Sequence, residues 1–307
     1  MQYAKPKVYW LMLIGIIFSI LNTTTSYAAP ICPQDDKMYY VGANPPSGST
    51  SLALSWTAGS TSRTFNFNDG TGTTMTVSFP LLVDRNSNSG GTPPFYGSIT
   101  DATQNALNLV HNSPAIKDNH TMNISVNRAV TRLGFVVQDL DSFRDNRLVP
   151  YQERVDVSST SGQLTYNTNY HTINANNNIV TAIIGRNCTV DCNIDATWGA
   201  KPANSTFSIT HSNQYTNNNS PHAVGYSDFY FCVTPPKLTT RKVLTGNRVE
   251  TNDQFTIATT TGTTPVSSFT TTGTGSSLTT NSITATGLST TATYTICLLY
   301  TSDAADE

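Results

Sequence analysis

Four cysteines have the most definite chemistry: Cys32, Cys188, Cys192 and Cys232. In an exported chain, an even number of cysteines predicts disulfide bonds, and we favour the pairs Cys188–Cys192 and Cys32–Cys232. The first pair encloses only Thr-Val-Asp, and the second joins the start and the end of one β-rich region. A redox or zinc site at Cys188 and Cys192 is less favoured, because redox pairs have a shorter gap and zinc needs two further ligands. Free thiols are the remaining alternative.

Four acids form a second group. Asp139 and Asp141 end a hydrophobic strand, and Glu153 and Asp156 follow the next loop. This pattern resembles secreted jelly-roll modules of bacterial surface proteins, and the resemblance implies a Ca²⁺ site built from these carboxylates. Asp139 and Asp141 share a strand face, so a cation would relieve their repulsion. Solvated acids or salt bridges to arginines are the favoured alternative. Those arginines are Arg144, Arg147 and Arg154.

Patterns for catalysis are weak. A glycosidase needs two carboxyls across a sugar cleft, and the sequence defines no such cleft. There is no Gly-x-Ser-x-Gly elbow and no phosphate-binding loop, so we expect no enzyme and no cofactor, with Ca²⁺ as the one alternative. The histidines lack the spacing of a zinc motif and lie in or beside polar segments, so we expect most of them to be exposed. They are His111, His120, His171, His211 and His222.

Several tyrosines are candidates for a sugar-binding platform, although core or sheet-surface tyrosines are the commoner case. They are Tyr166, Tyr170, Tyr215 and Tyr226. The composition limits the classes of function: the chain has 307 residues, 12% charged residues and a formal net charge of −2. This balance leaves no basic surface for nucleic acid, and Thr, Ser, Asn and Gly favour short strands and turns over long helices. An intracellular nucleotide-using enzyme is therefore disfavoured.

The N-terminus has the pattern of a secretion signal. Lys5 and Lys7 precede an apolar run from Val8 to Leu21, and small residues end at Ala28, where we expect cleavage. An uncleaved anchor is the alternative, but the run is shorter than the ~20 residues of a spanning helix. No later segment fits a membrane-spanning helix, so we expect a secreted or bacterial cell-surface protein with no membrane span after the signal at 1–28 is removed.

The C-terminus breaks the pattern of the preceding sequence. Residues 297–307 can be encoded by a string that matches the end of a transposase adapter used in sequencing libraries. We therefore expect this tail to be an artefact, Cys297 not to be a natural thiol, and the chain to be a fragment.

Residues 29–234 predict a jelly-roll-like β-sandwich. Phe65 and Phe67 lead into the turn 68–72, and Met75, Val77 and Phe79 alternate on the way back, which indicates a hairpin. Further short strands recur between Gly, Pro, Asn and Ser clusters. The predicted fold class is all-β: this sandwich followed by a small, incomplete prealbumin-like (Ig-type) sandwich.

The second domain begins after Pro235-Pro236, a pair that cannot continue a central strand. Residues 237–296 resemble SpaA-like, prealbumin-fold modules of bacterial surface proteins through a leading Lys-bearing strand, the strand Asn252–Ile257 and the strand Thr293–Ile296. Some modules of this family carry a Lys–Asn isopeptide bond, which would make Lys237 or Lys242 the amine here.

These features predict a non-enzymatic, adhesin-like protein of the bacterial surface. Its N-terminal sandwich would recognise a glycan or protein through exposed loops, chiefly 86–94 and 213–221, and prealbumin-like modules would form a stalk. A carbohydrate-binding module of a larger secreted protein or hydrolase is the alternative. Neither interpretation involves a nucleotide or nucleic acid.

Overall fold

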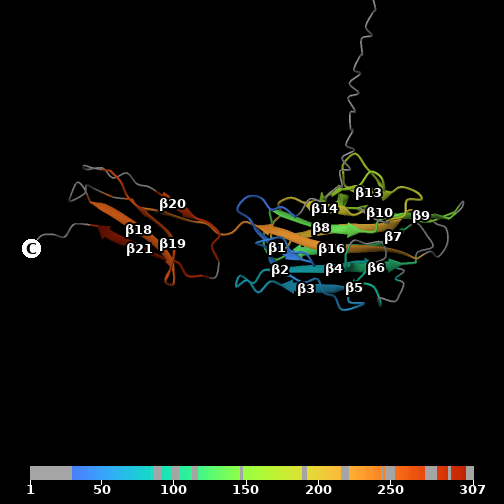
Figure 1. Cartoon of the computed structure of the whole chain (residues 1–307), viewed down its shortest axis with the longest axis horizontal. Coiled ribbons are helices and arrows are strands. Elements are labelled where there is room, and N and C mark those ends of the chain that lie inside the picture. Colours follow the sequence, from blue (N-terminus) through green and yellow to red (C-terminus); the bar gives the residue numbers. More distant parts are fainter. Residues whose placement is uncertain are drawn as a thin grey trace, which may run out of the picture.

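The computed structural model describes residues 30–83, 85, 91–98, 104–112, 117–145, 148–188, 192–215, 221–243, 245, 253–273, 282–289 and 292–301. Within these ranges the chain is all-β, with one 3₁₀ turn, η1 (Ser158–Thr160). Figure 1 shows a large sandwich and a smaller C-terminal module that follow one another along the long axis of the molecule. The predicted all-β class, with a large β-sandwich followed by a smaller β module, is confirmed for these residues.

The sandwich consists of two eight-stranded sheets, here sheet 1 and sheet 2. Sheet 1 has the order β11-β14-β8-β16-β1-β2, with β6 also paired to β16 and β5 paired to β6. Its strands are β1 (Lys37–Val41), β2 (Thr50–Leu52), β5 (Phe95–Gly97), β6 (Ala106–His111), β8 (Arg132–Gln138), β11 (Gln163–Thr165), β14 (Ile194–Trp198) and β16 (His222–Val233). The long strand β16 is central, because it pairs with β8 on one flank and with both β1 and β6 on the other.

Sheet 2 has the order β12-β13-β10-β15-β7-β4-β3, with β9 paired to β10. Its strands are β3 (Ser62–Asn66), β4 (Thr74–Leu82), β7 (Lys117–Val126), β9 (Ser142–Asp145), β10 (Leu148–Asp156), β12 (His171–Ile173), β13 (Ile179–Ala182) and β15 (Thr206–Asn213). The predicted hairpin is β3–β4, in which Phe65 lies opposite Met75. Alternate residues of both sheets fill one continuous core, as the period of two requires.

One glycine in β8 makes room for an aromatic ring on the outer face of sheet 1. A Cβ at Gly134 would lie 2.6 Å from Cε1 of Tyr230, a distance that real Cβ atoms do not tolerate. The ring of Tyr230 therefore lies directly on the backbone of β8, and larger residues at position 134 would push it away.

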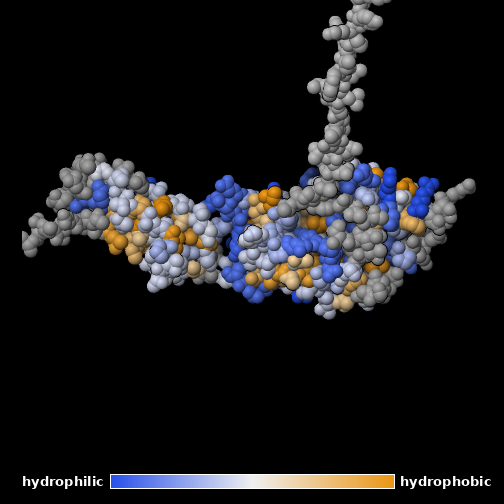
Figure 2. All heavy atoms as spheres, in the orientation of Figure 1, coloured by the Kyte–Doolittle hydropathy of each residue, from blue (hydrophilic) through white to orange (hydrophobic). Residues whose placement is uncertain are grey.

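The C-terminal module contains a two-stranded sheet, β17 (Leu238–Arg241) with β20 (Ser282–Ala285), and a three-stranded sheet in the order β19-β18-β21. The latter comprises β18 (Gln254–Thr261), β19 (Thr264–Thr270) and β21 (Thr295–Thr301). Three apolar residues of β21, Ile296, Leu298 and Leu299, are more than half exposed. Figure 2 shows patches of hydrophobic colour both on this module and on the visible face of the sandwich.

Candidate functional site

The structure brings together three of the four predicted calcium ligands and separates the fourth. Glu153 is fully buried, and its Oε2 accepts the backbone N–H of Asp141 at 2.9 Å. Burial raises the pKa of Glu153 well above its usual value, and the charges of Asp141 and Asp139 raise it further. Asp156 lies three residues along β10 on the opposite face, where Arg154 Nη2 is 3.0 Å from its Oδ2. The set of four therefore does not form one site, and Asp156 has the alternative role of a salt-bridge partner.

Glu153 instead contacts a group of buried histidines, which the sequence analysis placed wrongly. All five histidines are at least 97% buried, so the prediction that most are exposed is wrong. Four of them form what we call the histidine cluster: His111, His120, His211 and His222. Its members come from four strands, β6, β7, β15 and β16, and both sheets contribute two.

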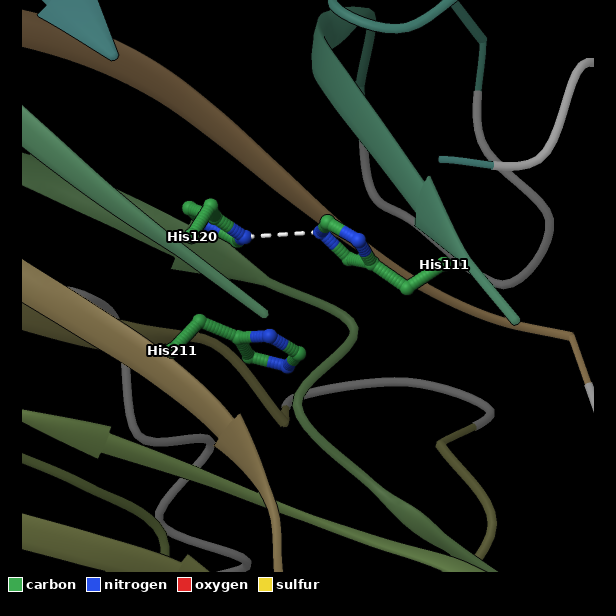
Figure 3. Close-up of side chains that lie close together, drawn as sticks. All are labelled: His111, His120 and His211. Atoms are coloured by element: carbon green, nitrogen blue, oxygen red, sulfur yellow. Dashed lines mark hydrogen bonds between the residues drawn. The ribbon is translucent and has the colours of Figure 1, made fainter. Parts of the chain in front are cut away.

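Strand register explains how the histidine cluster forms. His211 lies opposite His120 in sheet 2, and His222 lies opposite His111 in sheet 1. Each cross-strand pair points into the sandwich, so the two pairs meet in its interior. The ring centroids of His111 and His120 are 4.9 Å apart, and those of His120 and His211 are also 4.9 Å apart. Figure 3 shows the rings of His111, His120 and His211 close together, each from its own strand.

The histidine cluster is tied to its surroundings by hydrogen bonds. His111 Nδ1 is 2.9 Å from the carbonyl oxygen of Val83, and His111 Nε2 is 2.8 Å from His120 Nδ1. His120 Nε2 lies 2.6 Å from the hydroxyl of Tyr226, and His211 Nε2 lies 3.1 Å from Glu153 Oε1. Burial lowers the pKa of both His120 and His211 well below the usual value, and the neighbouring histidines lower it further.

Strand parity is the sequence signal that could have located these histidines. His120 has the same parity as the core residues Met122 and Ile124, and His211 has that of Phe207 and Ile209. A period-two pattern extended by one more step therefore places both imidazoles inside the sandwich. The spacing of a local zinc motif cannot reveal them, because the pair His111 and His120 is separated by about ninety residues from the pair His211 and His222.

A groove of about 540 Å³ lies on the outer face of sheet 1. Its lining includes polar and aromatic side chains, among them Tyr40, Gln104, Tyr166, Asp195, Asp228 and Tyr230. The register of β16 against β8 shifts between Ser227 and Tyr230, and Asp228 in this bulge has a positive φ of 53°. The carboxylate of Asp228 therefore faces the groove, while the rings of Phe229 and Phe231 stay in the core. The bulge thereby turns one segment of a core strand toward the groove.

Polar contacts organise the floor of this groove. The hydroxyl of Tyr40 and the amide of Gln104 both donate to the carboxylate of Asp228. Burial raises the pKa of Asp195 to about 6, and the negative charge of Asp228 contributes to that rise. The groove thus combines carboxyl and amide groups with tyrosine rings, a combination suited to a ligand with many hydroxyl groups.

Of the four tyrosines predicted as candidates for a sugar platform, one lines the groove and three do not. Tyr166 lines the groove, whereas Tyr226 is fully buried in the core, which is the alternative that the sequence left open. Tyr170 and Tyr215 are half-buried and lie outside the groove. The tips of the two predicted recognition loops, 86–90 and 216–220, lie outside the described residues.

Both predicted disulfide bonds are present. Cys32 joins Cys232 over a sequence separation of 200 residues, and Cys188 joins Cys192 over a separation of 4. The short loop is also anchored to the acidic group, because the N–H of Cys188 donates to Asp141 Oδ2 at 2.8 Å. Cys297 is an exposed free cysteine.

The two candidate isopeptide lysines lie in different surroundings. Lys237 is exposed, whereas Lys242 is half-buried, with its Nζ 4.8 Å from the centre of the Phe255 ring. Lys242 is therefore the one in contact with the packed face of β18. An isopeptide bond at either lysine stays a prediction.

Comparison with known proteins bears on the C-terminal module. Residues 237–306 match the family model of a prealbumin-like fold domain, SpaA_3. This part of the chain is a prealbumin-like module. The matched range extends past Ile296, where the sequence analysis ended the module, and the adapter origin of the tail stays a prediction. No curated protein and no solved structure matched the chain. Among the described residues, no helix is long and apolar enough to cross a membrane.

Proposed function

We propose that this chain is a non-enzymatic, adhesin-like protein of the bacterial cell surface, in which the N-terminal sandwich binds a ligand and the prealbumin-like module is part of a stalk. The prealbumin-like match and the disulfide bonds support a surface protein. The groove on sheet 1 is the observation that carries the binding role. It is large enough for a small ligand and is held by a rigid, disulfide-bonded sheet.

The chemistry of the groove favours a glycan as the ligand. Asp195 and Asp228 supply acceptors for hydroxyl groups, Gln104 supplies an amide, and the ring of Tyr166 supplies an apolar face. The same observation favours the second candidate, a carbohydrate-binding module of a larger secreted protein. Both candidates share the groove and differ in what the rest of the protein does.

A glycan array probed with the purified full chain tests this function. We expect binding that falls at least about tenfold in Tyr166→Ala and in Asp195→Asn, since each variant removes a direct contact worth about 1.4 kcal/mol or more. Tyr170→Ala is the matched control, because Tyr170 is half-buried but lies outside the groove, and it should bind like the wild type.

Two results would contradict the proposal. Glycan binding that persists in both groove variants would place recognition elsewhere on the sandwich. Release of new reducing ends from a bound oligosaccharide, abolished by Asp195→Asn, would show that the groove is an active site instead.

A further inference from the structure

We propose that His111, His120 and His211 bind a divalent transition-metal ion, with zinc as the first candidate, inside the sandwich at the end of β16 remote from the C-terminal module. One ring nitrogen of each of these three histidines lies within 4.8 Å of one from each of the others. Nitrogen ligands 2.0–2.1 Å from a tetrahedral zinc ion are about 3.4 Å apart, so no separation within this group needs to shorten by more than about 1.4 Å.

The hydrogen bonds of the cluster identify which nitrogens face the metal. The outer nitrogens are held by Val83 O, Tyr226 Oη and Glu153 Oε1, which contact His111 Nδ1, His120 Nε2 and His211 Nε2 respectively. The nitrogens that face one another, His111 Nε2, His120 Nδ1 and His211 Nδ1, are the ligand atoms, and the ion would replace the hydrogen bond between His111 Nε2 and His120 Nδ1. Metal-binding histidines are commonly oriented in this way, by a carbonyl, hydroxyl or carboxylate at the other ring nitrogen.

An unsatisfied atom supports the same site. His211 Nδ1 is fully buried and has no hydrogen-bond partner among the described residues. A buried polar atom in this state is costly unless it binds something. Flipping the ring would turn His211 Nε2 away from Glu153 Oε1, so this contact favours the orientation in which Nδ1 has no partner. A metal ion at His211 Nδ1 removes the deficit.

The donor set selects the class of ion. Three imidazole nitrogens suit zinc, copper or nickel and do not suit Ca²⁺, which takes oxygen ligands. Glu153 is buried against His211, so its carboxyl group holds the outer nitrogen of that proposed ligand and fixes the orientation of the ring. His222 Nε2 is hydrogen-bonded to Asn119 Oδ1 at 3.1 Å, and we leave His222 out of the ligand set.

Such an ion would connect the two sheets. His111 belongs to sheet 1, and His120 and His211 belong to sheet 2, so coordination joins them directly across the core. Cys232, near the other end of β16, is ten residues from His222, which corresponds to about 33 Å along a strand. The metal and the Cys32–Cys232 disulfide would therefore reinforce opposite ends of the same sandwich.

Metal content measured on the full chain tests the proposal. The chain should carry Cys297→Ser, to remove the exposed thiol, and no histidine tag. Because the cluster is buried, the protein should be unfolded in guanidinium with chelator but without reductant, and then refolded with and without zinc. We expect about one zinc per chain after dialysis and an unfolding midpoint about 5–10 °C higher with zinc at 100 times its Kd.

Variants assign the ligands. His211→Asn should lose the bound zinc, whereas His171→Asn, which removes a buried histidine outside the cluster, should retain about one equivalent. Glu153→Gln should lower the zinc affinity by about 10–100-fold, since it changes the partner of His211 and leaves all three ligands in place. If His211→Asn does not fold, refolding the Cys297→Ser chain with Co²⁺ supplies a second readout, because a tetrahedral histidine site gives a visible absorption band.

Two results would refute the metal site. A Cys297→Ser chain that refolds to its native circular dichroism, holds less than about 0.1 zinc, copper, nickel or cobalt ion per chain and melts at the same temperature with and without each metal would show that the cluster is a hydrogen-bonded network only. Equal zinc loss in His171→Asn and His211→Asn would likewise overturn the assignment.

Discussion

Removing the long disulfide should destabilise the sandwich far more than removing the short one. The perturbation is the double variant Cys32→Ala/Cys232→Ala, and the control is Cys188→Ala/Cys192→Ala. Cys188, Cys192 and Cys232 are each at least 99% buried, so both variants lose buried sulfur atoms. The main difference between them is the length of chain that each bond closes.

The sequence separations set the expected magnitudes. On the chain-entropy account, a separation of 200 residues corresponds to about 5 kcal/mol at 25 °C, and a separation of 4 corresponds to about 2 kcal/mol. The long disulfide should therefore contribute about 3 kcal/mol more to the free energy of unfolding. Its loss should also raise the denaturant m-value, because the unfolded chain becomes less compact.

Guanidinium unfolding followed by tryptophan fluorescence is the assay. Beyond the predicted signal segment the tryptophans are Trp56 and Trp198, both in the sandwich, so the signal reports that domain and not the C-terminal module. A larger loss of stability in the Cys188→Ala/Cys192→Ala variant, or equal losses in the two, would refute the reasoning that loop length decides the contribution.

Three further predictions concern single residues of the sandwich. The raised pKa of Asp195, about 6, means that its contribution to stability is complete below pH 4 and is lost as the pH rises through 6, so Asp195→Asn should be about 1–2 kcal/mol more stable than the wild type at pH 7.5 and nearly equal below pH 4, measured by urea unfolding across pH. Gly134→Val should destabilise by about 1–3 kcal/mol, since its side chain meets the ring of Tyr230, whereas Gly199→Val, where a Cβ meets nothing within 4 Å, should show none of that overlap; equal losses in thermal melts would contradict this. Phe231→Ala should cost about 3–5 kcal/mol because the ring is fully buried and stacks on Tyr39 at 4.9 Å, and a loss below about 1 kcal/mol in urea would show that the core collapses around the cavity.

Much of the fold could be predicted because it depends on local patterns. The alternation of Phe65 with polar neighbours predicted the β3–β4 hairpin, since a strand with one buried face shows a period of two whatever its partners are. The cysteine pairs could be predicted because few alternatives exist and one pair encloses a short loop. Pro235-Pro236 marked the boundary before the prealbumin-like module, since proline interrupts a strand.

The histidine cluster could not be predicted in the same way. Its members face one another only because β6 pairs with β16 and β7 pairs with β15, and because the two sheets then stack with both pairs at the same end. Polar neighbours in the sequence suggested exposure, but a strand residue is buried or exposed by its face and not by its neighbours. The position of Asp156 was wrong for the same reason: it is three residues from Glu153 and therefore on the opposite face.

The amino-acid sequence alone determined the β-rich class and the disulfide pairs, because composition, strand period and cysteine number act within short segments of chain. Only the tertiary structure decided which polar side chains meet. The groove depends on a register shift in β16, and the histidine cluster depends on two strand pairings and on the stacking of two sheets. Contacts between residues a hundred positions apart follow from sheet order and register, which local patterns do not encode.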